Sequence, residues 1–237
     1  MTTMHEIPRQ KRYALGWYNE GVTHLSMHEY KEALSFFDRA LRVVPDHPDF
    51  LVGKGEVMMA TGQYREAYQH FLAAATREPE NLKALVLLGS SLLRLDMPGP
   101  ADEAFLAALT LNRYDGEAWF GHGVALYHLG KKEEAREAFW QALRKKPGQP
   151  ELMYYLAKTA RNDREALGFL IRGCRLDPEN IDLLHEMAER LIAVGHYKEA
   201  TAFCKRAEAQ CPDNPETEDL IRRCMEGMIR EKNDVSP

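Results

Sequence analysis

The chain has 237 residues and a formal net charge of −5 at pH 7; 45% of its residues are hydrophobic and 28% are charged. This balance is typical of a soluble protein and provides no overall positive field that would attract nucleic acid. No segment approaches the roughly 18 apolar residues of a membrane span, and the N-terminus has no apolar core of signal-peptide length. The sequence therefore predicts a cytoplasmic protein that neither inserts into membranes nor binds nucleic acid.

Paired amphipathic helices are predicted along almost the whole chain. After a polar N-terminal arm at residues 1–13, two apolar stripes of helical spacing, separated by a short break, recur about every 34 residues. Six such units are predicted, at 14–47, 48–81, 82–115, 116–149, 150–180 and 181–214. A capping helix is expected at 215–231, where apolar residues alternate with charges, followed by a disordered tail at 232–237.

The same residue types return at fixed positions of these units. The first helix repeats a small residue, as Gly21, Gly55, Gly89, Gly123, Ala157 and Ala188. The second helix repeats an alanine, as Ala33, Ala67, Ala101, Ala135, Ala166 and Ala200. Four residues after the first four of these alanines stands an aromatic residue, as Phe37, Phe71, Phe105 and Phe139. A proline ends five of the six units, as Pro45, Pro79, Pro147, Pro178 and Pro212.

This pattern resembles the tetratricopeptide repeat, a 34-residue helix–turn–helix unit with Trp or Leu, Gly and Tyr in its first helix and Ala, Phe, Ala and Pro afterwards. The resemblance covers residues 14–214. It implies an all-α, right-handed superhelical solenoid whose concave wall, built from the first helices, binds peptides or partner proteins.

Two units depart from the pattern. The third has the proline-rich turn 96–100, in which Pro98 or Pro100 can start the second helix, and it ends in Arg113 instead of a proline. The fifth is three residues short, with Arg161-Asn162-Asp163-Arg164 in place of a turn that contains glycine. We therefore expect its first helix to lose most of a turn or its connection to tighten, with a local change in the twist of the stack.

First-helix residues outside the packing positions are predicted to line a groove that binds an extended peptide or a helix with apolar anchors. Glycines such as Gly53 and Gly121 would let a ligand backbone approach closely. A negative group on the ligand would reach Lys158 and Arg161, with Lys83 and Arg94 as secondary cations. The alternative is that some of these side chains pack on neighbouring helices, or that the chain termini fill the groove. The predicted groove residues are Tyr18, Asn19, Val22, Val52, Met59, Lys83, Val86, Leu87, Arg94, Phe120, Val124, Tyr127, Tyr154, Tyr155, Lys158 and Arg161.

The sequence contains no motif typical of a catalytic or cofactor-binding site. It has no glycine-rich phosphate loop, no GxSxG and no HExxH, so we predict no enzyme activity and no cofactor. Glu20, His24 and His28 share one helical stripe, but His24 falls in a packing position, and we expect no metal. The four cysteines lack zinc-ligand spacing and are expected to be small apolar residues. Of the positions that would clamp a peptide carboxylate in this family, only Lys83 fits.

The predicted function is therefore a non-catalytic adaptor or chaperone-like module for a protein segment. Two alternatives remain open from the sequence. The chain could be a self-associating scaffold that forms homo-oligomers, or a regulatory subunit of a larger complex.

Overall fold

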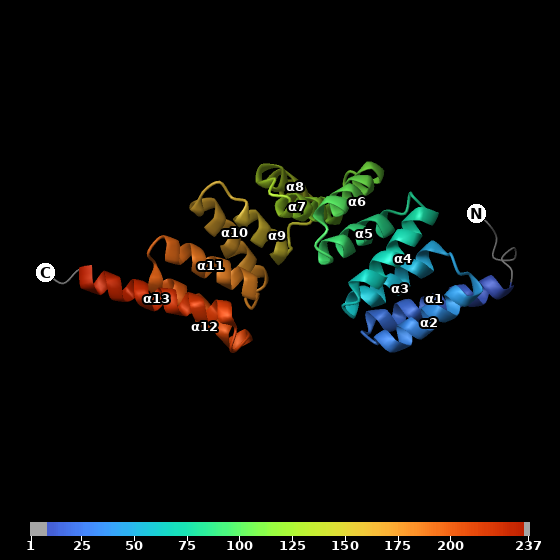
Figure 1. Ribbon diagram of the computed structural model, residues 1–237, viewed down its shortest axis with the longest axis horizontal. Helices are drawn as coiled ribbons and strands as arrows, with labels where there is room; N and C mark the ends of the chain where they lie inside the picture. Colours follow the sequence, from blue (N-terminus) through green and yellow to red (C-terminus); the bar gives the residue numbers. More distant parts are fainter. Residues whose placement is uncertain (1–8, 235–237) are drawn as a thin grey trace. The chain divides into compact units, whose positions relative to one another are not determined.

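The computed structural model describes residues 9–234, and this part of the chain is helical throughout, without a strand (Figure 1). The chain divides into two compact units, Met1–Lys131 and Lys132–Pro237. The first contains α1 (Arg9–Ser26), α2 (Tyr30–Val43), α3 (Pro48–Ala60), α4 (Tyr64–Arg77), α5 (Leu82–Arg94), α6 (Pro98–Leu111) and α7 (Gly116–His128). The second contains α8 (Lys132–Lys145), α9 (Pro150–Lys158), α10 (Asp163–Leu176), α11 (Ile181–Ala193), α12 (Tyr197–Gln210) and α13 (Pro215–Asp234). The expected all-α class is confirmed.

The helices begin where the sequence provides caps. Asn81, Asp115, Asn162 and Asn180 each accept a hydrogen bond from a backbone N–H three residues later, which satisfies a donor that the first helical turn would leave exposed. Proline occupies the first turn of α3, α6 and α9, where its missing N–H costs no internal hydrogen bond. Pro98 thus starts α6, as one of the two expected options.

Helix lengths match the repeat except at its expected irregularity. The first helices α3, α5, α7 and α11 each have 13 residues, whereas α9 has only 9. The short fifth unit therefore loses a turn of its first helix, which is one of the two outcomes expected from the sequence. At the ends of the chain, α1 begins inside the predicted arm and α13 continues to Asp234, beyond the predicted end of the capping helix. The remainder of the predicted arm and tail lies outside the described residues.

The division of the chain at Lys131 falls between α7 and α8. The predicted fourth repeat, 116–149, thus contributes its first helix to one unit and its second helix to the other. Within each unit, every helix packs on the next, and first helices also contact each other, as in α1 with α3, α3 with α5, and α9 with α11. The first helices consequently form a continuous layer within each unit.

Phenylalanines of the second helices hold the first unit together. Phe37, Phe71 and Phe105 are at most 1% exposed. A Cβ at Gly21 or Gly53 would lie within 2.8 Å of the Phe37 ring, so this ring fits between α1 and α3 only because both positions lack a side chain. Such close packing is sensitive to the addition of even one methyl group.

The turns between the paired helices contain a left-handed residue in every repeat except the fifth. Gly62, Gly130 and Gly195 occupy this position with φ between 77° and 81°. The equivalent residues of the first and third repeats are His28 and Asp96, with φ of 61° and 58°. A side chain with a Cβ is strained in this region.

We therefore expect His28→Gly to raise the free energy of unfolding by about 1 kcal/mol, and Gly62→Ala to lower it by a similar amount. His28 is exposed, and its Nδ1 lies 3.1 Å from the Tyr30 hydroxyl, a contact whose loss offsets only part of the gain. Urea denaturation of the two variants tests this. Unchanged midpoints in both would show that the turn tolerates a Cβ without strain.

Candidate functional site

The predicted groove residues of the first unit fall into two groups. Val52, Val86 and Val124 are buried, with 3%, 8% and 7% exposure, and Val52 and Val86 belong to a core cluster formed by residues of α3 to α7. Tyr18 is half-buried, and its ring lies 5.2 Å from that of Phe50. These side chains belong to the core and present little surface to a ligand, which corresponds to the packing alternative considered from the sequence.

The glycines predicted to admit a ligand backbone serve packing instead. A Cβ at Gly53 would lie 2.5 Å from the Phe37 ring, and one at Gly121 would lie 2.2 Å from the Phe105 ring. At the equivalent position of the second unit, Tyr155 stacks on Phe139 with ring centroids 5.3 Å apart. In these three repeats the position faces the phenylalanine of the preceding hairpin, so the expectation that Gly53 and Gly121 would receive a ligand backbone is corrected. In the third repeat the position holds Leu87, which packs in part against the core and also lines a pocket.

The accessible part of the predicted face in the first unit is mixed in character. Val22 is 41% exposed, and Lys83 retains 60% exposure of its side chain. The other predicted residues of this unit that are exposed or partly exposed are Asn19, Met59, Leu87, Arg94, Phe120 and Tyr127. Its two cations already have partners: Lys83 Nζ lies 2.8 Å from Glu56, and Arg94 donates to the Tyr64 hydroxyl.

A pocket of 240 Å³ opens among α3, α5 and α7 on this face. Its apolar wall comes from one helix, α5, and includes Val86 and Leu87, whereas carboxylates from α3 and from the start of α7 lie around it. The lining residues are Glu56, Leu82, Lys83, Val86, Leu87, Asp115 and Glu117. Three predicted groove residues, Lys83, Val86 and Leu87, are thus brought together in one concavity.

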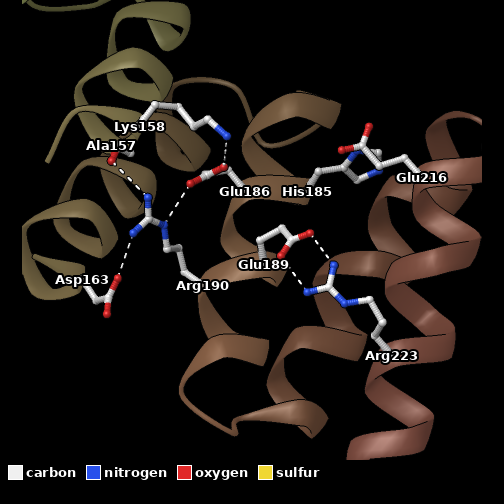
Figure 2. A network of polar contacts seen from close by, with 9 residues as sticks. All are labelled: Ala157, Lys158, Asp163, His185, Glu186, Glu189, Arg190, Glu216 and Arg223. Atoms are coloured by element: carbon white, nitrogen blue, oxygen red, sulfur yellow. Dashed lines mark hydrogen bonds and ion pairs between the residues drawn. The ribbon is translucent and has the colours of Figure 1, made fainter. Parts of the chain in front are cut away.

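In the second unit, Glu186 lies at the centre of a polar network that joins α9, α10 and α11 (Figure 2). Its carboxylate has only 7% exposure and accepts hydrogen bonds from Lys158 Nζ and Arg190 Nε, each at 2.9 Å. Arg190 also donates to Asp163 at 2.8 Å and to the carbonyl of Ala157 at 3.5 Å. Burial lowers the pKa of Arg190, but hydrogen bonds to Glu186 and Asp163 outweigh this and raise it overall.

A second set of contacts attaches α13 to α11. Arg223 donates to both carboxylate oxygens of Glu189, at 2.5 and 2.9 Å, and Figure 2 shows the two side chains facing each other between these helices. His185, which is buried, places Nε2 2.7 Å from the Thr217 hydroxyl and Nδ1 3.2 Å from Glu216. The last helix is therefore attached through specific polar contacts as well as apolar packing.

These networks border a pocket of 340 Å³ among α9, α11 and α13. Its lining residues are Tyr154, Lys158, Asp182, His185, Glu186, Glu189 and Glu216. Of the predicted groove residues, Tyr154 and Lys158 line it, while Arg161 is exposed and is not among the lining residues. The predicted cation Lys158 is engaged by Glu186 and lies 5.7 Å from the centroid of the Tyr154 ring.

Sequence reasoning assigned no site role to Arg190 or Arg223. One signal was available: Glu189 and Arg223 are 34 residues apart, which places opposite charges at equivalent positions of successive first helices. A similar signal was the four-residue spacing of Glu186 and Arg190 within one helix.

The described residues contain no group of three or more His, Cys, Asp or Glu side chains suited to a metal ion. His24 Nδ1 lies 2.5 Å from Glu29, and the His24 ring stacks on Phe36, so its contacts are structural. The four cysteines are free thiols. Burial, together with the neighbouring Cys224, raises the pKa of Cys204 to about 12, which disfavours a reactive thiolate. Among the helices of the described chain, none combines the length and apolarity needed to cross a membrane.

Comparison with solved structures finds close matches of fold. The chain in the complex of Cut9 with Hcn1, an APC/C hetero-tetramer, is 19% identical with a TM-score of 0.83; the match covers 92% of this chain and 44% of that one. PilF of Pseudomonas aeruginosa is 16% identical with a TM-score of 0.77, over 90% and 98% of the two chains. This chain thus spans less than half the length of the chain that it matches in the Cut9–Hcn1 complex.

YrrB, a tetratricopeptide repeat protein with an unusual peptide-binding site, is 28% identical with a TM-score of 0.58, over 73% of this chain and 90% of that one. A comparison with curated proteins finds no match. Two family models of the tetratricopeptide repeat match adjoining segments, residues 24–86 and 87–150, which together make up more than half of the chain. The chain therefore belongs to the tetratricopeptide repeat family, and its repeats form a protein–protein interaction module.

Proposed function

We propose that the protein is a non-catalytic adaptor or chaperone-like module that binds a peptide segment or a helix through the first-helix face of its first unit. The observation that carries this proposal is the pocket among α3, α5 and α7, which gathers Lys83, Val86 and Leu87. The similarity to YrrB, which has a peptide-binding site, supports binding on a stack of this kind.

The size and lining of the pocket favour an apolar side chain as the anchor. Its 240 Å³ is smaller than a typical small-molecule site and suits one or two side chains of a peptide. Leu82 and Leu87 offer partly exposed apolar surface, while Glu56 and Asp115 place acceptors beside it. An apolar anchor flanked by hydrogen-bond donors would match this arrangement.

The charges at the site shape the choice of ligand. From the sequence, a negative group on the ligand was expected to reach Lys158, Arg161, Lys83 or Arg94. In the structure, Lys83 and Lys158 are each paired with a glutamate, and carboxylates outnumber cations around both pockets. A ligand with neutral or positive groups beside its anchor therefore fits these surfaces better than an anionic one.

We expect Leu87→Glu to weaken peptide binding by at least tenfold, because the anchor would lose apolar contact and meet a further negative charge. The measurement is fluorescence anisotropy with peptides selected on the full chain from a random display library. Leu106→Glu is the matched control: it adds the same charge at an exposed leucine of α6, a second helix.

Binding that is unchanged in Leu106→Glu and lost in Leu87→Glu, with both variants equally folded by circular dichroism, supports the proposal. Equal loss in both variants, or no loss in Leu87→Glu, would place the binding surface elsewhere.

A further inference from the structure

The outer face of α13 does not resemble the end of a repeat stack. A terminal capping helix normally presents a polar surface to water. The inner face of α13 is conventional, because Leu220 and Cys224 are fully buried where the helix contacts α11 and α12. On the opposite side, however, Met225 and Ile229 are 55% and 57% exposed and lie one helical turn apart.

This exposed stripe is symmetrical along the helix. It reads Glu218, Ile221, Met225, Ile229 and Lys232, so the successive steps are 3, 4, 4 and 3 residues. Such spacing keeps all five side chains on one side of a helix, and in this case the order of residue types is also balanced about Met225. Ile221 is partly exposed, whereas Glu218 and Lys232 are exposed at the two ends of the stripe.

A stripe of this kind is complementary to itself when two helices run in opposite directions. With a two-fold axis at Met225, Met225 faces its counterpart and Ile221 faces Ile229 of the second copy. Glu218 then faces Lys232 of the second copy, and the axis creates this opposite-charge pair twice. A two-fold interface uses the same patch on both molecules, which is what this arrangement allows.

We propose that the protein forms a two-fold homodimer in which the α13 helices of two copies pair in an antiparallel manner through this stripe. A parallel pairing would place Glu218 against Glu218 and Lys232 against Lys232, which like-charge repulsion disfavours. This surface is separate from the pocket among α3, α5 and α7, so the dimer does not depend on peptide binding. It would bring two peptide-binding modules into one assembly.

The dimer is expected to be weak and dependent on concentration. One helix face buries less than the roughly 1,000 Å² that marks a stable interface. The two end charges are at the rim, where each pair contributes modestly and is screened by salt. The expected behaviour is therefore a reversible monomer–dimer equilibrium that shifts towards the monomer at high ionic strength.

Sedimentation velocity of the full chain over a range of concentrations tests the proposal. Glu218→Lys should raise the dimer dissociation constant by about tenfold, because two attractive pairs become repulsive, and Lys232→Glu should do the same. An equimolar mixture of the two variants should restore dimerisation, since every end contact between unlike copies again joins opposite charges. The weakening by each single variant is what distinguishes antiparallel pairing, because a parallel dimer has two like-charge contacts in the native chain and in either variant alone.

Met225→Asp removes the central apolar contact and should leave the protein monomeric. The matched control is Ile171→Asp, at a 46% exposed isoleucine of α10, which should dimerise as the native chain does. A native chain that stays monomeric at every concentration overturns the proposal and would indicate that the stripe binds a different partner. A mixture that fails to recover, while Met225→Asp still abolishes the dimer, also overturns the antiparallel arrangement.

Discussion

Replacing Gly121 by leucine is expected to lower the free energy of unfolding of the first unit by about 3 kcal/mol. Even the first added carbon would lie 2.2 Å from the Phe105 ring, closer than any real contact. Phe105 is 1% exposed and also contacts Gly89 on α5, so the ring is enclosed between two first helices and cannot move aside. Chemical denaturation followed by circular dichroism measures the change.

Gly16→Leu is the control for Gly121→Leu. Both glycines lie within first helices, but nothing lies within 4 Å of a Cβ at Gly16. Leucine forms helices better than glycine does, so this variant should be more stable than the native chain by about 0.5–1 kcal/mol. A similar loss in both variants would show that the cost arises from the larger side chain itself and not from the phenylalanine.

A double-mutant cycle assigns the cost to a specific pair. Phe105→Ala alone should destabilise the first unit by about 3–5 kcal/mol through the cavity that it leaves. Combined with Gly121→Leu, the loss should be smaller than the sum of the two, because the leucine side chain fills part of that cavity. Simple additivity would indicate that the two residues do not compete for the same space.

Arg190→Met should destabilise the second unit by about 2–3 kcal/mol. The change removes the hydrogen bond from Arg190 to Glu186, whose side chain is 7% exposed, and leaves this carboxylate with Lys158 as its partner in the network. It also disconnects α11 from Asp163 at the start of α10. The loss should be localised, so hydrogen exchange should rise in α9, α10 and α11.

The controls for Arg190→Met separate charge from packing. Arg164→Met removes an exposed arginine of α10 and should change stability by no more than about 0.5 kcal/mol. Adding Glu186→Gln to Arg190→Met should recover part of the loss, because a buried amide costs less than a buried carboxylate short of partners. If the double variant were less stable than Arg190→Met, the cost would not come from the charge of Glu186.

The repeat pattern predicted most of the architecture because each of its signals is local. The small residues of the first helix were expected at close crossings, and Gly21, Gly55 and Gly89 do lie against phenylalanine rings. The three-residue deletion in the fifth repeat is an equally local signal: it predicted either a shorter first helix or a tighter connection, and the structure has the shorter helix, α9.

The sequence could not predict in the same way which side chains of the first helices are exposed. Whether Val52 faces a ligand or the next helix depends on the rotation between successive hairpins, which a single repeat does not encode. The bonds of Arg190 to Asp163 on α10 and to Ala157 on α9 likewise depend on the reach of a long side chain across helices. The division of the chain at Lys131 crosses a repeat whose sequence is regular, so the repeat pattern gave no sign of it.

The placement of Phe37 against glycines of both α1 and α3 has a consequence for cooperativity. When one aromatic ring belongs to the cores of two hairpins at once, a hairpin that opens deprives its neighbour of buried area as well. Loss of structure should then spread from hairpin to hairpin, in the manner of a one-dimensional chain with strong coupling between adjacent sites. A truncation after α2 would leave that ring facing water on one side, so the shortest fragment that folds should end on a first helix.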